Sequence, residues 1–279
     1  MIKKHIPNFL TCCNLLCGCL GILFTASYQL NIAFYLILAA AAFDFFDGFA
    51  ARLLKVNSPI GKDLDSLADV VTFGVLPGFI MYKMISLTLL NSQIDVAINV
   101  FTLLDVVSIS NTINNNTFYF PFIAFIIPVF SALRLAKFNN DTRQTDSFIG
   151  VNTPANTLLI SSLGYIFINS IKSPENANTI YALFFNPYTL IVLTILMSYL
   201  LIAELPLFAL KFKKFGWAEN KIRYIFLIIT TILLILFQFY AFPFIIFLYI
   251  AFSIVNNFMN KRNKTVLKKN RNEEIQSRN

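Results

Sequence analysis

Four aspartates between residues 44 and 69 carry the clearest chemical signal in the sequence. Asp44 and Asp47 lie three residues apart, and Asp65 and Asp69 lie four residues apart. Each spacing puts two carboxylates on one face of an α-helix. Residues 57–59, Asn-Ser-Pro, interrupt the helical pattern between the pairs. We therefore expect an antiparallel helix hairpin that brings all four carboxylates together.

Small side chains and an arginine accompany the aspartates. Gly48 and Ala51 continue the face of the first pair, and Gly61 continues the face of the second. Residues this small leave room for a bulky ligand to approach the backbone. Arg52 is placed to reach a phosphate group.

The four carboxylates predict a metal site. Left unpaired beside apolar sequence they would be very costly. A divalent ion offsets that cost, and ligands that are all oxygen favour Mg²⁺ or Mn²⁺ over zinc. Four carboxylates can hold two ions, and a two-ion site suits displacement at phosphorus because it neutralises the attacking and leaving oxygens.

The aspartates have two alternative interpretations. The first is an ion-paired loop without a chemical role. The second is the ion pathway of a transporter, but transporter carboxylates usually scatter over several spans near the middle of the bilayer. Here they sit on one hairpin, which favours the metal site.

The composition indicates where this hairpin lies. Hydrophobic residues make up 57% of the chain and charged residues 13%, and the mean hydropathy is +0.68. A soluble domain carries about 25% charged residues, so that class is excluded. Crossing a ~30 Å hydrocarbon core takes about 20 helical residues. We predict an all-α, polytopic membrane bundle with about eight spans, at residues 8–27, 31–54, 64–90, 118–137, 154–171, 187–210, 222–239 and 241–258.

The basic residues predict the orientation. With both termini in the cytoplasm, all of the 22 Lys and Arg residues except Lys83 and Lys172 fall at the cytoplasmic ends of the spans or in the segments between them. The net charge of +8 then reflects topology and attraction to anionic lipids, not binding to nucleic acid. We expect one membrane domain at residues 1–258 and a basic, disordered tail at residues 259–279 on the bilayer surface.

The motif as a whole reads D-x2-D-G-x2-A-R-x8-G-x3-D-x3-D, from Asp44 to Asp69. It resembles the signature of the CDP-alcohol phosphatidyltransferase family, with every fixed position matched. Members of that family have a six-helix membrane core. They move a phosphatidyl group from a CDP-linked lipid to an alcohol and release CMP. The resemblance implies a multi-pass enzyme of the inner membrane, with its active site facing the cytoplasm, and a homodimer, since many relatives are dimeric.

The resemblance also implies a role for each residue. Asp44, Asp47 and Asp65 would be metal ligands, and Asp69 would be the general base as well as a further ligand. The segment PNFLT at residues 7–11 is similar to the family's segment at the start of its first span. The residues expected to contact the CDP-lipid are Asn8, Thr11, Gly48, Ala51, Arg52, Ser58 and Gly61.

Other stretches indicate the acceptor alcohol. LDSLADVVTFGVLPG at residues 64–78, ALRLAKFN at 132–139 and FIGVNTPANT at 148–157 resemble the branch of the family that uses L-serine. That branch usually reads closer to FxGLPxPA near residue 150, where this chain has Val151, Asn152 and Thr153 in the middle of the motif. Arg134, in an otherwise apolar helix end, is the predicted partner of a serine carboxylate, with a lipid phosphate as its alternative. Glycerol 3-phosphate, an inositol phosphate and choline are the alternative acceptors.

Overall fold

The chain separates into two compact units. The computed structural model describes residues 5–56, 58–91, 119–140, 147–172, 184–208 and 216–276. The first unit comprises Met1–Asp141 and Asn152–Ile202, and the second comprises Thr142–Val151 and Ala203–Asn279. The membrane domain expected at residues 1–258 stays a prediction.

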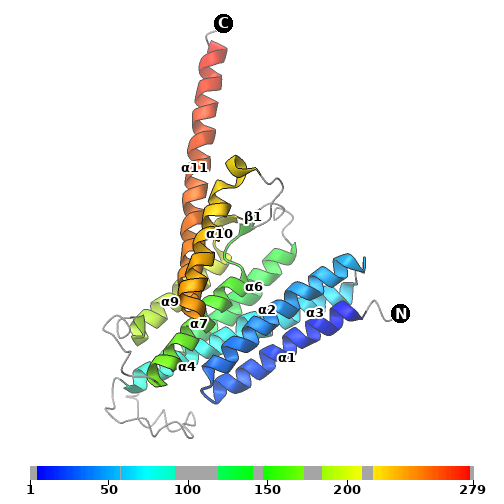
Figure 1. Ribbon diagram of the computed structural model, residues 1–279, viewed down its shortest axis with the longest axis vertical. Helices are drawn as coiled ribbons and strands as arrows, with labels where there is room; N and C mark the ends of the chain where they lie inside the picture. The colour runs from blue at the N-terminus through cyan, green and yellow to red at the C-terminus, as the bar shows by residue number, and fades with distance from the viewer. Residues whose placement is uncertain are drawn as a thin grey trace. The chain divides into compact units, whose positions relative to one another are not determined.

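The first unit is a helical bundle (Figure 1). α1 packs against α2, α3 and α4, while α7 packs against α2 and α4, and α9 against α4 and α6. Leu30, Ile80 and Ile127 belong to the fully buried core between these helices. The helical elements described in this unit are α1 (Ile6–Ala26), α2 (Leu30–Leu53), α3 (Pro59–Val70), η2 (Val71–Val75), α4 (Leu76–Asn91), η4 (Phe120–Phe125), α6 (Ile126–Asn140), α7 (Thr153–Lys172) and α9 (Pro187–Ile202).

Several helices are long and apolar enough to cross a bilayer, so the prediction of a helical membrane bundle is confirmed. Five stretches of the described residues meet that criterion, and α9 is a shorter apolar helix. The protein is therefore a multi-pass membrane protein. The five stretches are Ile6–Ala26, Leu30–Leu53, Pro59–Leu89, Phe120–Asn140 and Asn220–Met259.

The sixth predicted span ends earlier than expected. Helix was predicted over residues 187–210, but α9 ends at Ile202 and the strand β2 follows at Pro206–Phe208. Proline disfavours the helical conformation of the residue before it and has no backbone N–H to continue the helical ladder. Pro206 therefore accounts for the early end.

Glycines let α1 approach the helix that carries Asp65 and Asp69. A Cβ atom at Gly18 would lie 2.4 Å from Thr72 Oγ1, and one at Gly21 would lie 2.5 Å from Leu76 Cδ2. Small residues allow helix backbones in membranes to come this close. The polar residues of α1 can therefore reach the aspartates of α3.

We expect Gly18→Ala to destabilise the protein. The added Cβ would also lie 3.0 Å from Thr72 Cα, so α1 would have to move. Overpacking of this kind costs about 1–3 kcal/mol, against the gain of about 1 kcal/mol for alanine over glycine in a helix. Thermal unfolding in detergent measures the effect. Gly48→Ala is the matched control, since no atom lies within 4 Å of its added Cβ. An unchanged unfolding temperature for Gly18→Ala would contradict this packing.

The helix after the hairpin turn has a defined start and an irregular centre. Ser58 Oγ accepts a hydrogen bond from the Gly61 backbone N at 2.9 Å, and Pro59 occupies the first helical position. This arrangement is favourable at a helix N-terminus. Two residues after Asp69 the helix widens into the π-helical turn η2. Such turns inside α-helices are frequent at functional sites.

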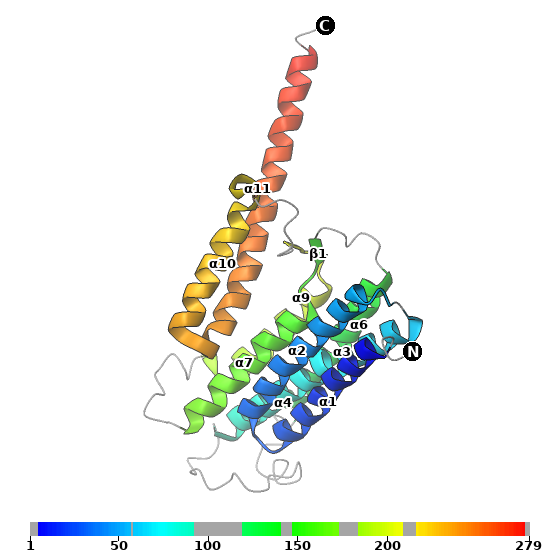
Figure 2. The same ribbon diagram turned by 45° about the vertical axis from the view of Figure 1, so that its right-hand side comes forward.

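The second unit contains a short antiparallel sheet and a helical hairpin. β1 (Ser147–Ile149) pairs with β2, with Phe148 opposite Leu207. α10 (Trp217–Phe237) leads through η6 (Gln238–Ala241) into α11 (Phe242–Gln276), and α10 and α11 lie side by side in Figures 1 and 2. Tyr249 on α11 donates a hydrogen bond to the Phe208 carbonyl at 2.9 Å.

The basic tail differs from its prediction. Residues 259–279 were expected to be disordered, but α11 continues as a helix to Gln276. The segment contains no glycine and no proline after Pro243, and Lys, Arg, Gln and Glu have favourable helix propensities. High charge alone does not prevent a helix that an apolar segment has already begun.

Candidate active site

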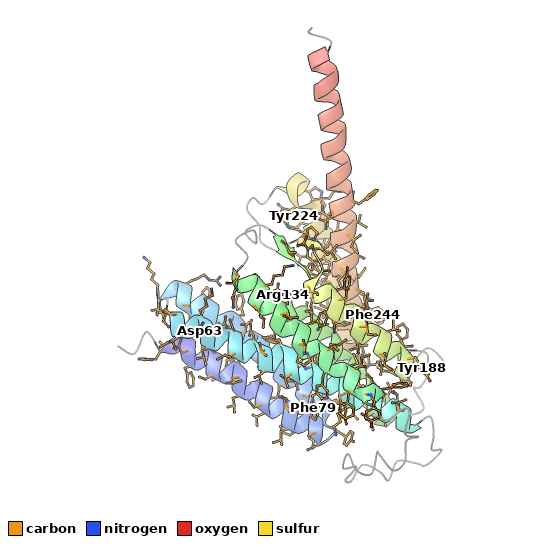
Figure 3. The ribbon with its side chains drawn as sticks, turned by 180° about the vertical axis from the view of Figure 1, so that it is seen from behind. Asp63, Phe79, Arg134, Tyr188, Tyr224 and Phe244 are labelled. Atoms are coloured by element: carbon orange, nitrogen blue, oxygen red, sulfur yellow. The ribbon has the colours of Figure 1, made fainter. Side chains whose placement is uncertain are left out.

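Three of the four predicted aspartates converge in the first unit. Carboxylate oxygens of Asp44, Asp47 and Asp65 all lie within 4.8 Å of one another. Two of these residues come from the C-terminal half of α2 and the third from α3. The hairpin that the spacing predicts is therefore present. Asp63, also on α3, is exposed and is not part of this group (Figure 3).

The three carboxylates fit a metal ion. At an effective dielectric constant near 20, like charges at this separation repel by roughly 3 kcal/mol or more per pair. Asp47 is only 6% exposed, and Asp65 Oδ1 is buried without a hydrogen-bond partner. A cation between them would offset the repulsion and supply the missing partner. The donors are all carboxylate oxygens, which hard divalent cations prefer.

Two hydrogen bonds from α1 hold the aspartates. Thr11 Oγ1 donates to Asp47 Oδ2 at 2.7 Å, and the Pro7 carbonyl oxygen lies 3.1 Å from the same hydroxyl. Asn14 Nδ2 donates to Asp69 Oδ1 at 3.2 Å. Asp69 is not in the three-carboxylate group; it is held one turn further along α1.

A pocket of about 500 Å³ lies beside the carboxylates. Its walls come from the start of α1, the end of α2 and the start of α3, which lie at one end of the unit in Figures 1 and 2. Asp47 and Asp65 form part of the wall. The predicted substrate contacts that line it are Asn8, Thr11, Gly48, Ala51, Ser58 and Gly61.

Two cations of the hairpin differ in their position relative to the pocket. Arg52 is exposed and is not among the residues that line the pocket. Lys62, one residue after Gly61, does line it. The pocket therefore has a positive side chain in its wall that the motif does not predict.

Arg134 lies outside the pocket, on α6 (Figure 3). It is only 5% exposed, and its Nε and Nη2 atoms are buried without a hydrogen-bond partner. Its Cζ lies 4.8 Å from the centre of the Phe138 ring. Its charge interacts with that of Asp69. The guanidinium therefore has two buried nitrogen atoms without a hydrogen-bond partner among the described residues.

Asn14 is a site residue that sequence reasoning missed. It is fully buried, and its bond to Asp69 joins residues 55 positions apart, which no local spacing reveals. One signal was available. Asn14 is a polar residue in an otherwise apolar stretch, three positions after Thr11, and therefore on the same face of α1.

Comparison with known proteins identifies the family of this chain. A family model described as CDP-alcohol phosphatidyltransferase matches residues 4–210. The chain belongs to this family. The match includes the start of α1, the aspartate hairpin, Arg134 and the helices up to α9.

Three similar curated proteins carry the name CDP-diacylglycerol–serine O-phosphatidyltransferase. The protein of that name from Helicobacter pylori strain J99 is 32% identical over 156 residues, which is 55% of this chain and 54% of the relative. The one from Bacillus subtilis strain 168 is 29% identical over 192 residues, covering 62% and 91%. The one from Methanocaldococcus jannaschii is 29% identical over 197 residues, covering 64% and 79%. The chain thus spans about half the length of the Helicobacter relative.

Proposed function

We propose that the protein transfers the phosphatidyl group of CDP-diacylglycerol to L-serine and releases CMP, as a step of phospholipid synthesis. One observation carries the proposal. Three aspartates of the family signature lie together, and two of them, Asp47 and Asp65, form part of the wall of a pocket that six predicted substrate contacts also line. The names of the similar proteins support the choice of serine.

The pocket is the proposed donor site. Asn8 and Thr11 would lie by the nucleotide, and Gly48 and Ala51 would leave room for the lipid-linked diphosphate. Ser58 and Gly61 would contact the same group at the start of α3, with positive charge from Lys62. Arg52 would contribute its charge only if its exposed side chain extended into the pocket.

The aspartates are the proposed metal ligands. Asp44, Asp47 and Asp65 would hold a divalent ion, Mg²⁺ or Mn²⁺, with Asp69 as a ligand if a second ion is bound. Bound metal supplies charge neutralisation for the diphosphate and the departing CMP. Thr11, through its bond to Asp47, would fix the direction of that ligand.

The proposed reaction is a single displacement at phosphorus. The serine hydroxyl oxygen forms a bond to the lipid-bearing phosphorus, while the bond from that phosphorus to the oxygen of CMP breaks. CMP leaves with the electron pair. Asp69 accepts the hydroxyl proton as general base, which raises the nucleophilicity of a weakly acidic alcohol. Asn14 occupies Asp69 Oδ1, so Oδ2 is the proposed proton acceptor.

Arg134 is the proposed partner of the serine carboxylate. We expect Arg134→Met to raise KM for serine by about 10- to 100-fold, because a hydrogen bond between charged groups contributes about 1.5–3 kcal/mol. Arg134→Lys keeps the charge but loses the planar, two-pronged guanidinium group, so the rise in KM for serine should be smaller. Steady-state kinetics of CMP release measures both. An unchanged serine KM in Arg134→Met, at unchanged KM for CDP-diacylglycerol, would place the carboxylate elsewhere.

The proposed setting is a cell's inner membrane. Both termini and the pocket would face the cytoplasm. The basic residues would lie on that side, in contact with anionic lipid. A homodimer is proposed from the family likeness.

The acceptor can be tested directly with purified protein in detergent. CMP release from CDP-diacylglycerol would be followed with L-serine, glycerol 3-phosphate, an inositol phosphate or choline, each with Mg²⁺ or Mn²⁺ and each with excess EDTA. We expect release with serine and metal only. Release with another alcohol would keep the family chemistry and overturn the serine assignment. Metal binding without release by any acceptor would favour a different role for the aspartates.

A further inference from the structure

Only one of the two polar side-chain atoms of Asn14 has a hydrogen-bond partner among the described residues. Its Nδ2 donates to Asp69 Oδ1, but its Oδ1 is buried and has no hydrogen-bond partner among the described residues. Buried side-chain oxygens in native proteins nearly always have a partner, so one without a partner requires an explanation. The opposite orientation of the amide would direct an oxygen at the Asp69 carboxylate, and two acceptors cannot bond to each other.

The position of Asn14 is fixed by its surroundings. Its backbone carbonyl accepts a hydrogen bond from Thr72 Oγ1 at 3.2 Å, and Gly18, one turn further along α1, lies against Thr72. Asn14 follows Thr11 on the buried face of α1. It therefore continues the buried polar face of α1 beyond Thr11, next to the proposed base.

The two residues that interact with Asp69 both have buried polar atoms without a hydrogen-bond partner among the described residues. Asn14 on α1 offers a buried acceptor, and Arg134 on α6 offers two buried donors. Both residues interact with Asp69, one by a hydrogen bond and one by its charge. A ligand that matches all three groups needs a cation or N–H donor, a hydroxyl and an anion. A hydroxy amino acid in its zwitterionic form has this combination.

We propose that Asn14 determines specificity for an amino-acid acceptor, by accepting a hydrogen bond from its α-ammonium group through Oδ1. This proposal rests on the proposed function. The same residue positions Asp69 through Nδ2, so recognition of the ammonium group and placement of the base share one side chain. A neutral amide suits this place, because another carboxylate there would add to the repulsion among the aspartates.

Two truncated acceptors separate the groups of serine. 3-Hydroxypropionate lacks the ammonium group, and ethanolamine lacks the carboxylate. For each protein, kcat/KM for serine is divided by kcat/KM for each analogue. Both values come from one preparation, so loss of folded protein cancels. In Asn14→Ala we expect the ratio of serine to 3-hydroxypropionate to fall about tenfold or more, with the ratio of serine to ethanolamine unchanged. Arg134→Met should show the reverse pattern.

A second readout needs no turnover. In an Asp69→Asn background with donor lipid and Mn²⁺ bound, serine should raise the unfolding temperature more than 3-hydroxypropionate does, and Asn14→Ala should abolish the difference. If Asn14→Ala lowered kcat/KM equally for serine and for 3-hydroxypropionate, the proposal would be overturned and Asn14 would be a positioning residue only. Absence of serine-dependent CMP release from the wild type would instead overturn the proposed function, and this inference with it.

Discussion

Asp69→Asn is expected to lower kcat for serine-dependent CMP release by about 10²–10⁴-fold, the usual contribution of a general base. Asparagine has nearly the same shape, and its side-chain oxygen can still accept the hydrogen bond that Asn14 now gives to Asp69. The packing of α1 on α3 should therefore survive. What is lost is the group that takes the serine proton.

The Asp69 prediction has a control on the same helix. Asp63→Asn removes an exposed carboxylate outside the three-aspartate group and should leave kcat within about twofold of the wild type. Mn²⁺ binding by Asp69→Asn should also persist, because Asp69 is not in that group. A rate close to that of the wild type in Asp69→Asn would remove this residue from the proton transfer. Loss of Mn²⁺ binding would make it primarily a ligand.

Asp65→Asn is expected to abolish stabilisation of the protein by metal. Binding to the folded state at a concentration 100 times Kd stabilises a protein by about 2.7 kcal/mol. The wild type should therefore unfold at a higher temperature with Mn²⁺ than with EDTA. Asp65 supplies one of the three clustered carboxylates and has a buried oxygen without a partner. Its variant should show no such difference.

The stability of the Asp65 variant in EDTA, compared with that of the wild type in EDTA, is a further check. Removing one of three like charges within 4.8 Å relieves repulsion. Metal-free Asp65→Asn should then be at least as stable as the metal-free wild type, although it is inactive. A metal-dependent rise in unfolding temperature equal to that of the wild type would contradict the assignment of Asp65 as a ligand.

The sequence allowed the hairpin of aspartates to be predicted because the relevant order is local. Spacings of three and four residues place Asp44 with Asp47, and Asp65 with Asp69, on common helix faces whatever surrounds them. Ser58 and Pro59 mark the start of the second helix by their own chemistry. Most of the predicted apolar runs likewise contain helices in the described residues, since length and hydropathy suffice to predict a helical span, although the helix of the sixth run ends at Ile202.

Features that depend on distant partners could not be predicted. The bond between Asn14 and Asp69 and the charge interaction between Arg134 and Asp69 arise only when α1, α3 and α6 pack together. The π-helical turn after Asp69 also has a partner that is distant in sequence. Thr157 on α7 donates to the Phe73 carbonyl of that turn at 2.8 Å, across 84 positions of sequence. The helix in the basic tail continues from the apolar part of α11, which the composition of the tail alone does not reveal.

The central claim is that the serine hydroxyl oxygen attacks the lipid-bearing phosphorus. Serine labelled with ¹⁸O in its hydroxyl group, supplied to the purified protein with CDP-diacylglycerol and Mn²⁺, tests this directly by mass spectrometry of both products. We predict phosphatidylserine that carries the label and an equal amount of unlabelled CMP. Phosphatidate with a serine-linked, labelled nucleotide, or the absence of any serine-containing lipid, would contradict the claim.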